Sequence, residues 1–150
     1  MIFCIHADAD DDTDINTFQF KINPAVTAID QMRENSVCNN LVAVVPVQMT
    51  EAWMLSNTRL LKSEIGTDKT DTELCIDKHP EGYNDPKEVI KNAIRIGRQE
   101  LPRRRRNELK IESLYALIGQ KISLTSLETL PSYLKFKKAV EDSFKKMNIL

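Results

Sequence analysis

Two aspartates near the start of the chain are the first residues whose type and spacing could do chemistry. Asp8 and Asp10 are separated by one residue and follow the apolar segment Ile2–Ile5. This segment predicts a short buried strand, and open α/β sheets place their ligand sites at the carboxyl ends of such strands. If the strand geometry persists to residue 10, both carboxylates leave the same face.

Two carboxylates on one face predict a bound divalent cation. Negative charges a few ångströms apart repel each other unless a cation lies between them. Oxygen ligands favour Mg²⁺, Mn²⁺ or Ca²⁺ over zinc. The alternative is a solvated acidic turn, because aspartate side chains bond to nearby backbone amides in turns.

A third carboxylate is expected at the same edge of the sheet. Residues 41–47 form the clearest strand of the sequence, and Thr50 then caps a helix that contains Glu51. Glu51 would therefore lie beside Asp8 and Asp10. Its alternative role is structural, because the helix dipole favours a carboxylate in the first helical turn.

The elements around these carboxylates predict a small α/β fold. The alternation of residues 18–22 indicates a second short strand, and Asn23, which precedes a proline, predicts the start of a helix over about 24–35. Strand 41–47 is apolar and β-branched throughout, which is typical of a buried parallel strand. A strand–helix–strand unit follows.

The second half of the chain is predicted to be helical. Asp85 caps a helix that ends near Arg98. Further helices are expected over 111–118, over 124–130 and from Ser132 onward, the first with Tyr115 in its apolar stripe.

No linker divides the sequence, so we expect one compact unit over residues 1–150. Its parts are an α/β part at 1–84, which carries the acidic site, and a basic helical part at 85–150. The fold class is thus a small, mainly parallel sheet with a helical C-terminal half.

Charge is distributed unevenly along the chain, although the net charge is only −1. Residues 1–40 carry seven acids against two bases, residues 41–85 eight against four, and residues 86–150 seven against fifteen. A basic end suits the binding of a polyanion, and the alternative is an ordinary lysine-rich helix surface.

Five basic residues are candidates for contact with nucleic-acid phosphates. Lys87 lies in a first helical turn, where the helix dipole disfavours a cation, and four arginines follow one another directly. Arginine clusters bind phosphate groups, although a solvated run paired with nearby acids remains the alternative. The four arginines are Arg103, Arg104, Arg105 and Arg106.

Composition excludes several classes of protein. No apolar run is long enough for a membrane span and no signal peptide precedes the first strand, so we expect a cytoplasmic protein without a membrane partner. Three widely spaced cysteines and two histidines argue against structural zinc. Four scattered glycines argue against a phosphate-binding loop. An EF-hand loop is excluded by Thr13 and Gln19, which occupy its glycine and glutamate positions.

Several segments resemble a known group of proteins. The strand followed by His6-Ala7-Asp8-Ala9-Asp10 resembles the Asp-x-Asp motif of Toprim folds, which occur in primases, topoisomerases and OLD-family nucleases. Three other segments are similar to an uncharacterised bacterial family of Toprim-like proteins, which is associated with phage defence and ATPase partners. They are residues 46–55, Asp85-Pro86-Lys87, and the arginine-rich stretch that leads to Leu114-Tyr115 and residues 119–122.

The resemblance covers nearly the whole chain and implies metal-dependent cleavage of phosphodiester bonds. It implies that Asp8 and Asp10 hold Mg²⁺ or Mn²⁺, that Glu51 binds the metal or a water, and that the basic residues hold the nucleic-acid backbone. In Toprim enzymes a glutamate after an earlier strand completes the site, and this sequence starts at what would be the later strand.

That departure leaves two hypotheses. The chain is a nuclease, or a nuclease subunit of a defence system, whose missing glutamate comes from a partner or a second copy. Alternatively, it is a non-catalytic interaction subunit that docks on an ATPase or another partner. The enzyme needs a bound divalent metal and a third carboxylate, whereas the docking subunit needs an exposed apolar patch.

Overall fold

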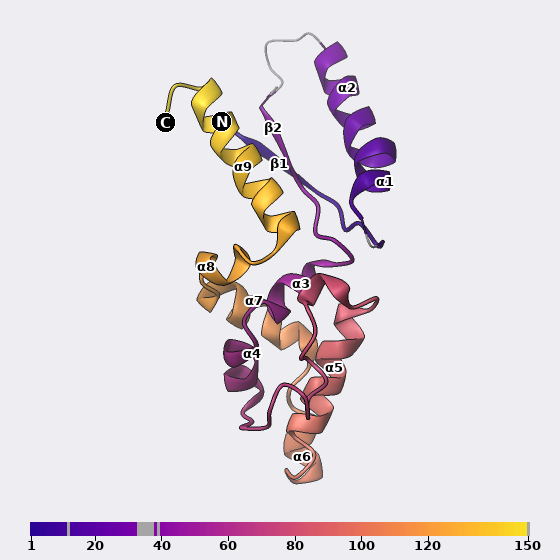
Figure 1. The fold of residues 1–150 in the computed structure, drawn as a ribbon, viewed down its shortest axis with the longest axis vertical. Helices are drawn as coiled ribbons and strands as arrows, with labels where there is room; N and C mark the ends of the chain where they lie inside the picture. The colour runs from indigo at the N-terminus through magenta and orange to yellow at the C-terminus, as the bar shows by residue number, and fades with distance from the viewer. Residues whose placement is uncertain (12, 33–37, 39, 150) are drawn as a thin grey trace.

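The computed structural model of the protein describes residues 1–11, 13–32, 38 and 40–149. Figure 1 shows an elongated molecule, with the sheet and helices α2 and α9 at one end and helix α6 at the other. The fold is a small α/β fold in which most helices follow the sheet in the chain. This confirms the predicted fold class.

The sheet described has two parallel strands, β1 (Phe3–His6) and β2 (Leu41–Val44). Phe3 lies opposite Leu41 and His6 opposite Val44. Main-chain pairing continues past the end of β1, because the N–H of Ala7 donates to Val44 O and that of Ala9 to Pro46 O. A parallel strand–helix–strand unit is therefore present, as predicted, but its first strand is β1 at Phe3–His6 and not the predicted strand at residues 18–22.

Residues 15–31 are helical throughout, so the predicted strand at residues 18–22 is wrong. The alternation would place Phe18, Phe20 and Ile22 on one buried face of a strand. Phe20 is instead 69% exposed. Phe18, Ile22 and Val26 recur at helical spacing instead and pack against residues of the two strands. The helical segment consists of α1 (Ile15–Thr17), the π-helical turn η1 (Phe18–Ile22) and α2 (Asn23–Gln31).

Pro24 lies inside this segment, which corrects the predicted helix start at Asn23. Asn23 already has helical backbone angles, with φ −60° and ψ −41°. Proline has no N–H to donate to an earlier carbonyl, and the wider π-helical turn lies directly before it. Helix α2 ends at Gln31, and positions 33–35 of the predicted helix lie outside the described residues.

Helices make up most of the chain after β2. In the described ranges, no helix combines the length and the apolar character needed to cross a bilayer. In chain order these elements are α3 (Thr50–Leu55), α4 (Thr58–Ile65), the 3₁₀ turn η2 (Pro80–Gly82), α5 (Pro86–Gly97), α6 (Arg103–Arg106), α7 (Ile111–Lys121), α8 (Leu124–Leu127) and α9 (Pro131–Lys146).

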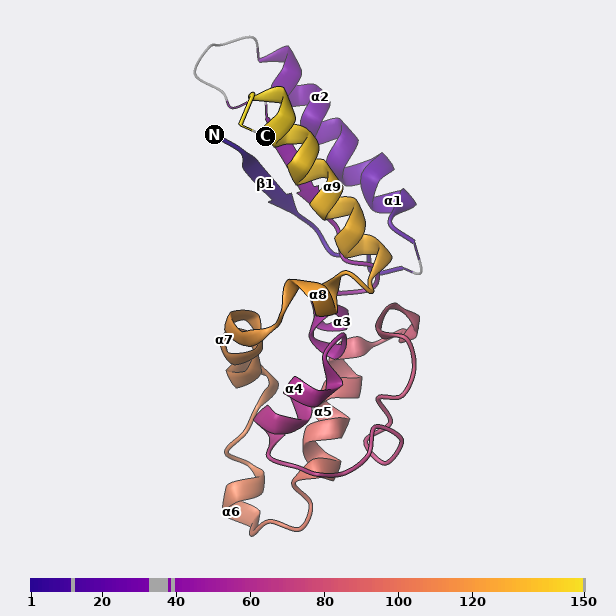
Figure 2. The ribbon, with the colours of Figure 1, turned by 60° about the vertical axis from the view of Figure 1, so that its left-hand side comes forward.

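The main hydrophobic core joins helices α3, α4, α5 and α7. Its fully buried members include Leu61, Ile65, Ile90, Leu114 and Ile118. Each comes from the apolar stripe of its own helix, so the helices pack with their stripes turned inward. This core lies between the sheet and α6 (Figures 1 and 2).

Two helix boundaries follow the signals in the sequence. The Asp85 side chain accepts the N–H of Glu88 at 2.8 Å and caps α5 as predicted. Gly66, with a φ of 76°, ends α4 in the left-handed conformation that glycine adopts without strain.

Helix α9 returns to the sheet and packs against β2. Near the start of α9, the Ser132 hydroxyl accepts a hydrogen bond from the Trp53 indole N–H at 2.9 Å. The rings of Tyr133 and Trp53 pack edge to face, with 5.5 Å between their centroids. Leu130 rather than Ser132 occupies the cap position, which corrects the predicted helix start. Trp53 therefore links α3 of the helical region to the helix that covers the sheet.

Candidate functional site

Polar side chains gather where the two parallel strands end and helix α3 begins. His6 is the last residue of β1, and Asp8 follows it by two positions. Beyond β2, the chain passes through a buried stretch at 45–47 and enters α3 with Thr50 and Glu51. The expectation that Asp8 and the start of this helix meet at the carboxyl edge of the sheet is therefore confirmed.

Asp8 joins the end of β1 to the start of α3. Its Oδ1 accepts the backbone N–H of Thr50 at 3.0 Å and the Thr50 hydroxyl at 2.9 Å. The predicted cap is thus corrected, because Met49 occupies the cap position and Asp8, from the loop after β1, accepts the N–H of Thr50 in the first turn. Within the described part of the chain, Asp8 Oδ2 accepts no hydrogen bond.

His6 completes a small polar network with Asp8 and Thr50. Its Nε2 lies 3.1 Å from Thr50 Oγ1 and 3.3 Å from Asp8 Oδ1. The threonine hydroxyl has one proton and gives it to Asp8, so the imidazole must supply the proton between itself and Thr50. His6 Nε2 is therefore protonated in this arrangement, and the ring is about half exposed to solvent.

Glu51 is buried, with 6% of its surface exposed, and Tyr115 of helix α7 donates a hydrogen bond to it. The Tyr115 hydroxyl lies 2.5 Å from Glu51 Oε1. Desolvation raises the pKa of Tyr115, and the hydrogen bond to Glu51 and the negative charges of Glu51, Glu112 and Asp8 raise this pKa further. The phenol is therefore a permanent donor at neutral pH, and it fixes one oxygen of Glu51.

Asp10 does not continue the strand. Its φ is 54°, and its N–H donates to Gln48 O at 2.8 Å. Gln48 has a φ of 59° and donates back to Asp11 O. Extended geometry therefore ends at Ala9, so the condition on which the shared face of Asp8 and Asp10 depended is not met.

The structure thus brings two of the three predicted metal ligands to one edge and leaves Asp10 exposed on the adjoining turn. Across the described ranges, no group of three or more His, Cys, Asp or Glu side chains could hold a metal ion. Mg²⁺ is often held by one or two carboxylates, with water and substrate phosphate as its other ligands. Asp8 and Glu51 each keep one oxygen outside these hydrogen bonds among the described residues.

The predicted phosphate-binding residues do not lie together. Lys87 is half-buried in the first turn of α5, whereas Arg103–Arg106 form the exposed helix α6 beyond the other end of α5. Helix α5 has twelve residues and is therefore about 18 Å long, and this length separates Lys87 from the arginines of α6. Of the four arginines, Arg104 is 3.9 Å from a carboxylate oxygen of Glu108.

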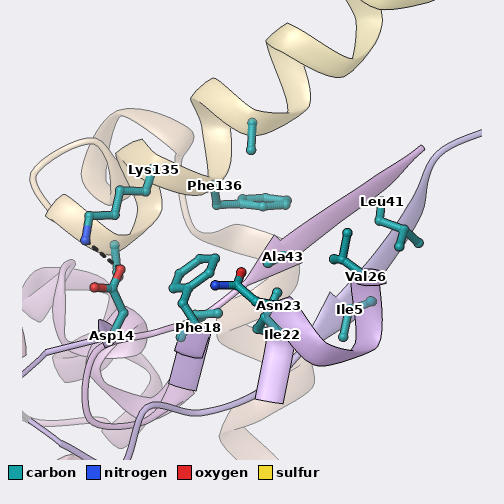
Figure 3. Close-up of a pocket in the computed structure, with 13 residues that line it drawn as sticks. Ile5, Asp14, Phe18, Ile22, Asn23, Val26, Leu41, Ala43, Lys135 and Phe136 are labelled. Atoms are coloured by element: carbon teal, nitrogen blue, oxygen red, sulfur yellow. Dashed lines mark hydrogen bonds and ion pairs between the residues drawn. The ribbon is translucent and has the colours of Figure 1, made fainter. Parts of the chain in front are cut away.

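A separate cavity of about 250 Å³ lies among β2, η1, α2 and α9 (Figure 3). The rings of Phe18 and Phe136 line it, and the rest of its wall is mostly aliphatic. At one side Lys135 donates to Asp14 Oδ2 at 2.5 Å, and the Asp14 side chain is only 8% exposed. Asp14 is therefore neutralised by α9 and is not a further ligand of the acidic site.

Sequence reasoning missed the roles of His6 and Tyr115. The sequence pattern gives His6 no role beyond the argument against zinc, and it places Tyr115 in an apolar helical stripe. A tyrosine in a buried stripe needs a partner for its hydroxyl, which was the available signal. Nothing in the spacing points to Glu51 as that partner, because the two residues are 64 positions apart.

Comparison with known proteins gave no relative. The chain matches no family model, no curated protein and no solved structure. A function is therefore proposed from the geometry of the site.

Proposed function

We propose that the protein is a divalent-metal-dependent nuclease, or the nuclease subunit of a defence system. Asp8 and Glu51 would hold Mg²⁺ or Mn²⁺ at the carboxyl edge of the sheet. The observation that carries this proposal is that each carboxylate has one oxygen fixed by a protein donor and the other outside those hydrogen bonds. The resemblance of the Asp-x-Asp segment to Toprim folds agrees with it.

The fixed oxygens support preorganisation of the site. Thr50 holds Asp8 through two hydrogen bonds, and Tyr115 holds Glu51 through one. A ligand that is already oriented loses little conformational freedom when a metal binds. A third carboxylate would come from Asp10, or from a partner protein or a second copy of the chain.

The chemistry follows from the charges of a phosphodiester. A bound divalent ion neutralises the phosphoryl oxygens and lowers the pKa of a coordinated water. On the protein side, His6 holds a proton at Nε2 at the edge of the site. As the imidazolium, His6 would give this proton to the oxygen that leaves phosphorus and become the neutral imidazole, and solvent would replace the proton because the ring is half exposed.

A second function is favoured by one observation on the sheet. Among the described residues, strand β1 has a hydrogen-bonded partner strand on one side only, and Phe3 on β1 is 54% exposed. An exposed apolar residue on an edge strand is suited to docking another protein. The alternative is therefore a non-catalytic subunit that docks on an ATPase or another partner.

A measurement of metal binding distinguishes the nuclease from the docking subunit. Calorimetry with Mg²⁺ and Mn²⁺ is carried out on the native chain, on Asp8→Asn/Glu51→Gln and on Asp68→Asn, an exposed acid of the helical region. Each protein is also incubated with labelled DNA and RNA. The nuclease requires binding and cleavage by the native chain, loss of both in the double variant, and no effect of Asp68→Asn. A native chain that neither binds metal nor cleaves would contradict a stand-alone nuclease and leave a nuclease subunit that requires a partner's carboxylate, or the docking subunit.

A further inference from the structure

A basic hollow lies at the end of the molecule opposite the sheet. It is formed by the C-terminal part of α5, by α6 and by the segment that leads into α7, and it has a volume of about 760 Å³. Six cationic side chains line it and no carboxylate does. They are Lys91, Arg95, Arg98, Arg103, Arg106 and Lys110.

One of these arginines builds the hollow. Arg98 Nη1 donates to Ile65 O at 3.0 Å, and its Nη2 donates to Arg105 O at 2.7 Å. These bonds tie α6 to the end of α5 and to α4, so the position of α6 is fixed by main-chain acceptors. The wall that carries Arg103 and Arg106 is therefore part of the folded structure (Figures 1 and 2).

Most of the remaining cations are not neutralised by the protein. Among the described residues, Arg103, Arg106 and Lys110 have no hydrogen bond or ion pair from their side chains, and Arg95 bonds only to the neutral Asn92. Lys91 has a carboxylate partner, Glu88, at 3.3 Å. Like charges held around one hollow repel each other, and a bound polyanion relieves this repulsion.

We propose that this hollow binds backbone phosphates of a nucleic acid. Guanidinium groups donate in a planar fork that matches phosphate oxygens, and three of the lining side chains outside the structural Arg98 are guanidinium groups. The four consecutive arginines do not act as one group. Arg103 and Arg106 line the hollow, whereas Arg104 lies near Glu108.

The placement of the hollow indicates a polymer as the ligand, and this step rests on the proposed function. Helix α5 begins beside α3, which carries Glu51, and its length of about 18 Å separates that region from the hollow. A single nucleotide is too short to reach both. Phosphates along one strand of duplex are about 3.4 Å apart along the axis, so roughly five nucleotides cover this distance.

Binding without metal tests the hollow separately from the nuclease. Fluorescence anisotropy is measured in EDTA with labelled single-stranded DNA, single-stranded RNA and duplex DNA over a range of salt concentrations. Each phosphate contact contributes about 0.7 to the salt slope for a single strand and about 0.9 for a duplex. Arg95→Gln/Arg103→Gln/Arg106→Gln should therefore reduce the slope by about 2 and weaken single-strand binding roughly 100-fold at 0.1 M salt. All three side chains are exposed, so the fold should persist.

A matched variant distinguishes the hollow from net charge. Arg59→Gln/Lys78→Gln/Lys146→Gln removes the same charge from exposed positions elsewhere and should keep most of the affinity. Equal losses in the two triple variants, or no nucleic-acid binding by the native chain, would overturn the proposal. Poly-glutamate that binds as tightly, with the same sensitivity to the first triple variant, would identify an acidic protein as the ligand and overturn it as well.

The two proposals fail in different ways. Asp8→Asn/Glu51→Gln should bind nucleic acid in EDTA at least as tightly as the native chain, because the hollow is unchanged and two negative charges near the nucleic-acid strand are removed. Binding that persists in a protein that never cleaves would leave the hollow intact and contradict the stand-alone nuclease. Cleavage that does not depend on Arg95, Arg103 and Arg106 would contradict the hollow alone.

Discussion

The hydrogen bond between Tyr115 and Glu51 shows how much a single contact can determine at this site. Glu51 is 6% exposed, and the phenol is its hydrogen-bond donor among the described side chains. A buried carboxylate without a donor is costly, so the hydrogen bond from the tyrosine stabilises Glu51 at the edge of the sheet. A structural role for Glu51 and a metal-binding role therefore both depend on Tyr115.

Tyr115→Phe tests this dependence. The change removes one hydroxyl and leaves Glu51 Oε1 without its donor, so the free energy of unfolding should fall by about 1–3 kcal/mol at pH 7. Urea denaturation measures it. In a Glu51→Leu background the same change should cost much less, because the carboxylate is gone. Equal costs in both backgrounds would show that the hydrogen bond is not the cause.

The same variant should change how stability depends on alkaline pH. Burial and Glu51 raise the pKa of Tyr115 above its ordinary value of 10.0, so the folded state holds this proton more tightly than the unfolded state. The resulting stability is complete below about pH 10 and is lost as the pH rises through the raised pKa. Tyr115→Phe should flatten the decline above pH 10, whereas an unchanged slope would assign the decline to other groups.

At the scale of elements, the sequence predicted each helix or strand better where one pattern applied than where two competed. The cap of α5 at Asp85 is a local signal and was predicted correctly, and the glycine that ends α4 is a signal of the same kind. Residues 18–22 fit alternation and helical spacing equally well, and packing of Phe18 and Ile22 against the sheet decided in favour of a helix. Local propensity could not decide this, because the deciding contact is tertiary.

Two helical glycines give opposite predictions. A Cβ at Gly97 would lie 2.8 Å from Ile65 Cγ2 in the core, whereas a Cβ at Gly119 would meet no atom within 4 Å. Ile65 is fully buried and its β-branched side chain is stiff, so Gly97→Ala should destabilise the fold by about 1–3 kcal/mol. Gly119→Ala should stabilise it by roughly 0.5–1 kcal/mol through helix propensity.

Thermal or urea denaturation of both variants checks this pair. The two substitutions are chemically identical and both lie in helices, so propensity alone would shift them in the same direction. Stabilisation by Gly97→Ala would mean that α4 and α5 move apart easily. The close packing of the two helices, and with it the fixed position of the hollow, would then be contradicted.

At the scale of the whole molecule, the sequence shows how charge is distributed along the chain, but not how the charged side chains are arranged in space. The C-terminal part carries fifteen bases, and six of them surround one hollow. Others lie on α9, where Lys135 pairs with Asp14 and Lys137 with Glu128. Sequence order could not distinguish these two groups, because α9 returns to the sheet while α6 remains at the far end.

The junction between sheet and helical regions leads to a prediction about cooperativity. Trp53, the single tryptophan of the chain, donates to Ser132 Oγ at 2.9 Å and packs against Tyr133. If this junction couples the two regions into one unit, tryptophan fluorescence and far-ultraviolet circular dichroism should give coincident urea transitions. Two separate transitions would show that the regions unfold independently.

Ser132→Ala tests the junction directly. Ser132 is 2% exposed, so the change leaves the Trp53 indole N–H without its acceptor and should lower the free energy of unfolding by about 1–3 kcal/mol. Ser63→Ala, at an exposed helical position, should stay within about 0.5 kcal/mol of the native chain. If Ser132→Ala also separates the two spectroscopic transitions, this hydrogen bond is part of what couples the sheet to the helical region. If it lowers both midpoints together, packing of Trp53 against Tyr133 and Phe136 is sufficient for coupling.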